Sequence, residues 1–262
     1  MNGNSEYFKT NVSYVAGVKI HSIGSGKVIS LLQERKNVRE NQNGLSIRFV
    51  NAFSISDSYT FEGYKNLLNS DGLNLVDGLP LAIALMLIRK EKFTRVRGPS
   101  FFKNVLAHDF GPDSKHLLVG SDPKTLGVLE EKISNMYPIA NIVGSYSPPI
   151  FHESDENEIS HIVQMVKSVD ADFVWIALGT PKQDYVTAQI ASKTKSTALG
   201  VGAAFDFLSG SKLEAPKIIQ VVGLEWFFRL LTEPTRLWKR YLKGNLIFLY
   251  AVLKFEILKV SK

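Results

Sequence analysis

The sequence predicts an α/β protein with a Rossmann-like, mostly parallel sheet, helices on both faces, and a C-terminal helical appendage that binds a membrane. Short apolar segments alternate with helical segments along most of the chain, which is the pattern of a parallel sheet covered on both faces. The composition changes near residues 210–216, where a basic and aromatic tail begins. We therefore divide the chain into a core, 1–211, and an appendage, 212–262.

The composition limits the chemistry that the chain can perform. It has 262 residues, 45% of them hydrophobic, which is enough for one sizeable core. It has no cysteine, which excludes thiolate metal sites, disulfides and a cysteine nucleophile and agrees with a reducing cytoplasm. We expect no signal peptide, and no apolar run approaches the ~20 residues that a membrane span requires.

The first half of the chain predicts three strands and three helices. Pro80 suits the first turn of a helix, and the polar turn Asn69–Gly72 separates the second helix from the third strand. The expected strands are Tyr14–Ile20, Leu45–Val50 and Leu73–Val76, and the expected helices are Val28–Lys36, Tyr59–Leu68 and Leu81–Ile88.

The second half repeats the alternation. Its expected strands are His116–Gly120, Ala140–Gly144, Asp172–Gly179 and Ser196–Val201, and its expected helices are Lys124–Met136, Glu156–Val169 and 180–190. Ligands of such sheets bind beyond the carboxyl ends of the strands. The residues at or just past those ends, which we expect to form the rim of a pocket, are Asn51, Asp77, Gly120, Gly144, Gln183 and Gly202.

Asp77 is the first candidate for a catalytic residue. It stands between an apolar strand and Gly78, where partial burial would raise its proton affinity and suit a general base. The alternative is an aspartate that satisfies the turn or caps the following helix.

Two segments have the features of a phosphate site. Arg95 and Arg97 could each bind phosphate oxygens, or could be solvated loop charges. Thr180–Gln183 opens a helix, where unpaired N–H groups and Lys182 favour an anion. Gln183 could then contact a sugar or a uracil, although simple capping explains the segment equally well.

The segment Gly200–Phe205 nearly matches the dinucleotide-binding fingerprint, with Phe205 in the place of the third glycine. This is weak evidence for NAD. A tight turn at Gly202 would still let the backbone approach a ligand, and Asp206 would lie within reach of a ribose or sugar hydroxyl.

We expect no metal site. Asp170 and Asp172 have the D-x-D spacing that holds a divalent cation in many sugar transferases, but they precede their strand and so lie at the wrong end of the sheet. Loop acids are the favoured interpretation. The five histidines show no zinc-ligand spacing, and the sequence contains neither a P-loop nor a nucleophile elbow.

The appendage carries the whole net charge of +6, with ten Lys and Arg residues against four acids. Arg229, Arg236 and Arg240 share one helical face if Pro234 only kinks or restarts the helix. Together with neighbouring Trp and Tyr residues they predict contact with an anionic membrane through residues 227–262. The alternatives are an oligomer interface or packing onto the core, and the continuous apolar surface disfavours nucleic acid.

Several of these segments together resemble the WecG/TagA/CpsF family of bacterial glycosyltransferases, over roughly residues 45–250. The segments that carry the resemblance are 76–81 (VDGLPL), 178–183 (LGTPKQ), 200–210 (GVGAAFDFLSG), Ala215-Pro216 and 223–245 (GLEWFFRLLTEPTRLWKRYLKGN). The resemblance implies an inverting, metal-independent transfer of an N-acetylmannosamine-type sugar, or a uronic acid relative, from a UDP donor. The implied acceptor is an undecaprenyl-diphosphate-linked glycan at the cytoplasmic face of the plasma membrane, and no cofactor is implied.

The resemblance also implies roles for individual residues. Asp77 would remove the proton from the acceptor hydroxyl, and Arg95 would bind the donor diphosphate. The residues implied to contact substrate or lipid diphosphate are Asn51, Gln183, Arg229, Arg236 and Arg240.

Three positions depart from the family pattern: Phe49, Ser100 and Glu214, where the family often has Thr, an acid and Arg. Glu214 therefore reverses a charge near the expected pocket, which could signal a different sugar. Two other functions stay open on sequence alone, an NAD-dependent oxidoreductase and a non-catalytic membrane-bound adaptor. The donor sugar, the acceptor glycan and the presence of a homo-oligomer do not follow from the sequence.

Overall fold

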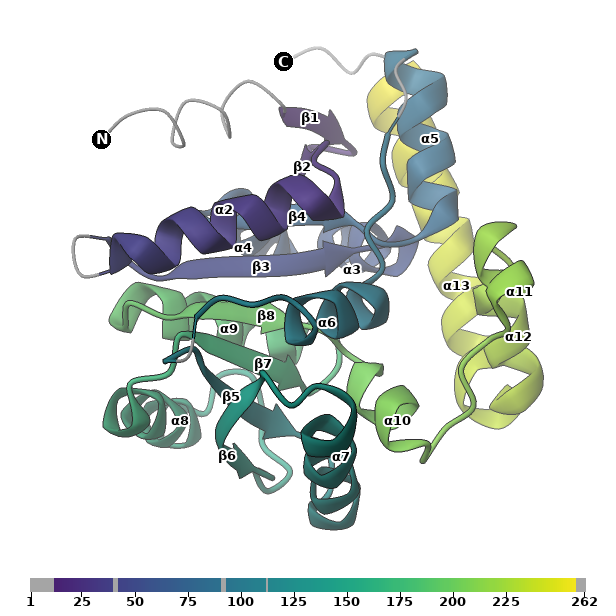
Figure 1. Cartoon of the computed structure of the whole chain (residues 1–262). Helices are drawn as coiled ribbons and strands as arrows, with labels where there is room; N and C mark the ends of the chain where they lie inside the picture. The colour runs from purple at the N-terminus through teal and green to yellow at the C-terminus, as the bar shows by residue number, and fades with distance from the viewer. Residues whose placement is uncertain (1–11, 40–41, 91–92, 112, 258–262) are drawn as a thin grey trace.

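The computed structural model describes residues 12–39, 42–90, 93–111 and 113–257, and it confirms the α/β fold (Figure 1). Eight strands form one sheet in the order β1-β2-β4-β3-β8-β7-β5-β6, and all pairings are parallel except that of β1 with β2. The strands are β1 Val12–Val15, β2 Val18–His21, β3 Leu45–Val50, β4 Leu73–Val76, β5 Lys115–Gly120, β6 Asn141–Tyr146, β7 Phe173–Ala177 and β8 Thr197–Gly200.

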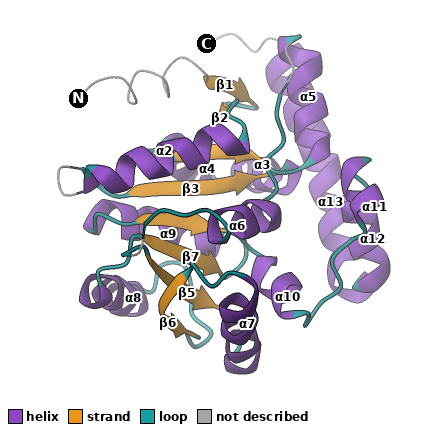
Figure 2. Ribbon diagram, viewed as in Figure 1, coloured by secondary structure: helices purple, strands orange, loops and turns teal. Residues whose placement is uncertain are grey.

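Helices cover both faces of the sheet (Figure 2). The helices are α2 Ser25–Asn37, α3 Ala52–Thr60, α4 Glu62–Asn69, α5 Leu79–Arg89, α6 Gly98–Leu106, α7 Pro123–Met136, α8 Glu156–Val169, α9 Lys182–Lys193, α10 Ala204–Ser209, α11 Lys217–Val221, α12 Glu225–Thr232 and α13 Pro234–Val252, with a π-helical turn, η2, at Leu253–Ile257. The apolar side chains of α2, α6, α7 and α10 form one core with the sheet, and those of α4, α8 and α9 lie on the opposite face.

Helix α6 positions the loop that precedes it. Phe102 of α6 is fully buried and packs edge-on against Trp175 of β7, with ring centroids 4.8 Å apart. Aromatic pairs of this kind add to the burial of both rings. Because α6 begins directly after Arg97, this packing fixes the arginine-bearing loop at the carboxyl ends of the strands.

The C-terminal helix α13 packs on the core through one face. Leu237, Phe248 and Ala251 are buried, and the last two share a cluster with Ile55 of α3 and Leu85 of α5. In Figure 1, α5 and α13 stand side by side at one edge of the molecule, next to α11 and α12. Among the described residues, none of the helices combines the length and the apolar composition that a bilayer crossing requires.

The structure corrects two of the predicted elements and adds two helices that were not predicted. The strand predicted at Tyr14–Ile20 is a hairpin, because Ala16 and Gly17 both have positive φ angles, 50° and 77°, and turn the chain. Helices α3 and α6 are additional to the predicted elements, and they start at a polar and at a glycine-proline segment, respectively. Strand β6 continues to Tyr146, so Gly144 lies inside an edge strand rather than at its carboxyl end.

Candidate active site

Asp77 follows β4 directly, and backbone hydrogen bonds join this strand end to the end of β3 and to the loop that precedes α6. Its own N–H donates to the Val50 carbonyl at 2.9 Å, and the Val96 N–H donates to the Val76 carbonyl at 2.7 Å. The Gly98 N–H lies 3.4 Å from Asp77 Oδ1. The loop that carries Arg95 and Arg97 therefore lies against the end of β4, next to the carboxylate of Asp77.

The environment of Asp77 raises its proton affinity. Burial raises the pKa of Asp77 to about 6, Glu225 adds to the rise, and Arg97, Arg95 and the Gly98 N–H oppose it. The residue is partly buried and not sealed from solvent. A carboxyl group with this pKa is about nine-tenths ionised at pH 7 and is a stronger base than an ordinary aspartate.

The two arginines connect this strand end to the C-terminal helices. Arg97 forms ion pairs with Glu225 at 2.6 Å and with Glu214 at 3.2 Å, and Arg95 Nη2 donates to the Gln220 carbonyl at 2.6 Å. Sequence reasoning singled out both arginines but not Glu225 or Gln220. More than one hundred residues separate the partners, so no local pattern could have paired them.

The glycine turn after β8 is held by Gln183, which is 3% exposed. Its Nε2 donates to the Gly200 carbonyl at 2.9 Å, and its Oε1 accepts from the Gly202 N–H at 3.1 Å. Gly202 has a φ of +57°, a conformation that favours glycine. Gln183 therefore shapes the turn through contacts with the protein itself.

A family model for the glycosyltransferases named WecG/TagA/CpsF matches residues 13–261. The chain belongs to this family. It is accordingly a glycosyltransferase, and the family indicates a role in the synthesis of cell-surface polysaccharide. The arginine-flanked carboxylate and the glycine turn described above lie at the carboxyl ends of β4 and β8, where parallel sheets bind their ligands.

Of three other predicted site residues of this glycosyltransferase, Asn51 lies beside Gly78 at the strand end that carries Asp77, whereas Gly144 lies far from it. Asn51 caps α3, with Oδ1 accepting from the Phe53 and Ser54 N–H groups at 2.9 and 3.2 Å. Asp206 pairs with Lys212 at 2.5 Å. Gly144 does not join Asp77: five strand spacings separate β6 from β4, about 24 Å. The edge strand is thus too remote to share one small ligand with the carboxylate.

Of the three tail arginines, the structure describes one in full. Arg229 lies on α12 with its guanidinium carbon 5.9 Å from the centre of the Phe207 ring, and its Nε is buried without a hydrogen-bond partner among the described residues. Arg236 and Arg240 belong to α13, but their side chains lie outside the described part of the chain.

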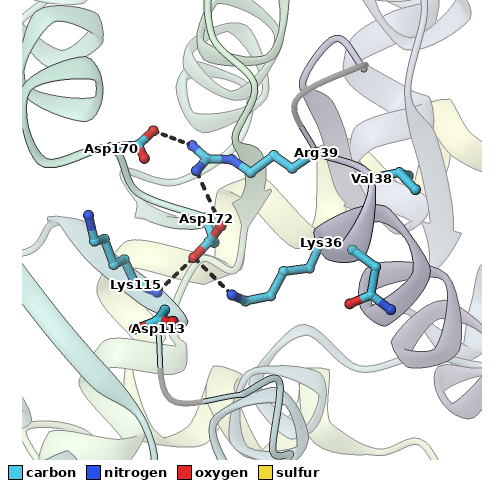
Figure 3. Close-up of a pocket in the computed structure, with 8 residues that line it drawn as sticks. Lys36, Val38, Arg39, Asp113, Lys115, Asp170 and Asp172 are labelled. Carbon is cyan, nitrogen blue, oxygen red and sulfur yellow. Dashed lines mark hydrogen bonds and ion pairs between the residues drawn. The ribbon is translucent and has the colours of Figure 1, made fainter.

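The D-x-D acids lie at the opposite, amino edge of the sheet, beside a cavity of about 310 Å³ (Figure 3). Arg39 pairs with Asp170 at 2.8 Å and with Asp172 at 3.3 Å, and Asp172 also accepts from the Lys115 N–H at 2.9 Å. Lys36 completes the cluster at 3.7 Å from Asp172. These acids are engaged by protein cations, as expected for loop acids. Within the described residues no group of three or more His, Asp or Glu is arranged to hold a metal ion, and a metal-free mechanism stays a prediction.

Proposed function

We propose that this glycosyltransferase moves an N-acetylmannosamine-type sugar, or a uronic acid relative, from a UDP donor to a polyprenyl-diphosphate-linked acceptor, with inversion and without a metal. The observation that carries the proposal is the single carboxylate at the end of β4, with a pKa of about 6, on a strand end lined by Arg95 and Arg97. This arrangement supports both halves of the reaction, a base for the acceptor and cations for the leaving group.

The transfer is one displacement at the anomeric carbon. The acceptor hydroxyl oxygen attacks that carbon and its proton passes to Asp77, while the bond to the UDP oxygen breaks and its electron pair leaves with the diphosphate. Attack opposite the leaving group inverts the configuration. Arg95 is suited to bind the diphosphate. Of its three guanidinium nitrogens, only Nη2 has a polar contact with the described residues. The protonated Asp77 then releases its proton to solvent.

The C-terminal helices suit an acceptor held at a membrane. Trp238, Leu242 and Leu246 on α13 are half or more exposed, and Lys239 and Lys243 interleave with them. Aromatic and basic side chains on one apolar helix favour a position at the surface of an anionic bilayer. We place the protein at the cytoplasmic face of the plasma membrane as a peripheral protein, with no nucleic-acid partner.

An oxidoreductase function finds less support in the same geometry. The Gly202 N–H, which a dinucleotide pyrophosphate would need, is occupied by Gln183, and Phe205 is fully buried against Phe102. A thermal-shift comparison of UDP with NAD separates the two functions, because a ligand raises the melting temperature only where it binds the folded protein.

The decisive experiment is a transfer assay with a panel of UDP-sugars and a polyprenyl-diphosphate-linked sugar acceptor. One donor should support turnover by the wild type, and Asp77→Asn should lower kcat by about 10²–10⁴-fold, the range for a general base. Asp170→Asn is the matched control, an acid at the opposite edge of the sheet, and should retain full activity. Unchanged turnover by Asp77→Asn would contradict the assignment of the base.

A further inference from the structure

Each of the three guanidinium nitrogens of Arg97 contacts an acceptor from the protein. Its Nε donates to Glu225 Oε2 at 2.9 Å, and its Nη1 donates to Ser100 Oγ at 2.6 Å and to Gln220 Oε1 at 2.7 Å. Its Nη2 contacts Glu225 at 2.6 Å and Glu214 at 3.2 Å. A guanidinium group has five N–H bonds, and four of them donate hydrogen bonds here, while Nη2 also forms the ion pair with Glu225. Arg97 can therefore bind no diphosphate without losing one of these contacts.

Glu225 is shared between the two arginines. While Oε2 contacts Arg97, Oε1 lies 3.4 Å from Arg95 Nη2. Glu225 is the first residue of α12, so one carboxylate joins the C-terminal helices to the loop beside Asp77. The side chain of Glu225 is 23% exposed, which leaves its charge only partly screened by solvent.

We propose that Glu225 is a positioning residue of the transfer reaction: it holds Arg95 and Arg97 at the end of β4 and shares their positive charge with Asp77 and with the donor diphosphate. The inference rests on the proposed function and adds to it a residue on the appendage. Three anionic groups, Glu225, Asp77 and the donor diphosphate, then interact with the same pair of arginines. Removing the charge of Glu225 leaves more of the arginine charge for the other two.

The electrostatics of Asp77 agree with this sharing. Among the described residues, the charged groups that act on Asp77 are Glu225, which raises its pKa, and Arg97 and Arg95, which lower it. Loss of the Glu225 charge removes the first effect and strengthens the second, because the arginines lose their competing carboxylate. Both changes lower the pKa of Asp77. The same loss should improve binding of a diphosphate at Arg95.

The test compares Glu225→Gln with Glu214→Gln in the full-length protein. Each variant removes one acid from Arg97, but the other contact of Glu214 is Lys103, at 2.6 Å, and not Arg95. For Glu225→Gln we expect the acid limb of the pH profile of kcat/KM to move at least half a pH unit lower, on the order of the effect of one nearby charge. Calorimetric titration with UDP should show about three- to tenfold tighter binding, as expected for one charge-assisted contact at a partly exposed site. Glu214→Gln should leave UDP binding unchanged and should move the acid limb by less than Glu225→Gln does, because Glu214 contacts only Arg97 of the two arginines.

Glu225→Asp distinguishes charge from packing, since it keeps the charge on a shorter side chain. It should return the acid limb toward the wild-type pH, and a shift as large as that of Glu225→Gln would overturn the proposal. If Glu225→Gln does not fold, Glu225→Asp decides alone: its weaker arginine contacts should still tighten UDP binding, and equal or weaker binding would overturn the proposal.

The same experiments separate an error about the role of Glu225 from an error about the proposed transfer from a UDP donor. A wild-type protein that binds no UDP contradicts the proposed function, and this inference with it. A wild type that binds UDP, beside a folded Glu225→Gln variant that binds it equally and has the same acid limb, contradicts only the role of Glu225. A Glu214→Gln variant that moves the limb equally far does the same.

Discussion

At the scale of single residues, the carboxylate that suits catalysis also lowers the stability of the fold. The pKa of Asp77 rises from 3.8 to about 6 on folding, chiefly because burial disfavours the charged form. The folded protein therefore holds this proton more tightly than the unfolded chain does. The stabilisation is complete below pH 3.8 and is lost as the pH rises through 6.

Asp77→Asn should consequently stabilise the protein while it slows transfer. The rise in pKa corresponds to at most about 3 kcal/mol of unfolding free energy, and partial exposure of Asp77 reduces this to about 1–2 kcal/mol. Urea unfolding should show a gain that is small at pH 4 and complete by pH 7. Asp170→Asn, which removes an acid that is 65% exposed, should give no such gain. A variant of Asp77 that loses stability at pH 7 would show that the carboxylate is structurally required.

The sequence alone placed Asp77 at this strand end but did not predict the residues around it. An acid after an apolar strand and before glycine locates Asp77 because parallel strands place their carboxyl ends at one edge. The contacts of Glu225 and Glu214 with Arg97 depend on how the C-terminal helices fold back. Ser100 and Glu214, which are far apart in the sequence, meet on this one guanidinium group.

At the scale of elements, the turn after β8 depends on a side chain from α9. Gln183→Ala should leave the Gly200 carbonyl and the Gly202 N–H without their partners and open a small cavity. We expect a loss of about 2–4 kcal/mol in unfolding free energy, measured by urea titration.

Gln183→Glu is the control for hydrogen-bond direction. A carboxylate can accept from the Gly202 N–H but cannot donate to the Gly200 carbonyl, so this variant should also lose stability, although its volume is unchanged. Wild-type stability in both variants would mean that Gln183 does not hold the turn and is free to contact substrate.

Helix α3 is hard to predict from sequence because its own residues favour a helix only weakly. Helix α3, Ala52–Thr60, is rich in Ser and other residues of low helix propensity, and the capping box of Asn51 and Ser54 stabilises its start. Its burial against α13 supplies the rest, and that contact joins residues far apart in the chain. The parallel strands were predictable because each is a short continuous apolar run, whereas their order across the sheet depends on long-range packing.

At the scale of the whole molecule, α13 has two apolar faces, and the described part of the chain covers only one of them. Leu237, Phe248 and Ala251 pack on the core, so deleting the C-terminal helix would uncover buried surface and could not test membrane binding cleanly. The other face presents Leu242 and Leu246, 61% and 62% exposed and one helical turn apart. Point substitutions on this face are the sharper probe, because they leave the packed face intact.

The double variant Leu242→Ser/Leu246→Ser should lose at least about tenfold in binding to vesicles with anionic lipid, since insertion buries each leucine and contributes about 1.5–3 kcal/mol at full burial. Flotation of the folded protein with vesicles measures this. Ile150→Ser is the matched control, a fully exposed apolar residue on the β6 side of the sheet, and should float like the wild type. Equal flotation of the double variant and the control would place the membrane contact elsewhere. Loss of flotation together with unchanged UDP binding would separate the lipid-facing surface from the nucleotide site.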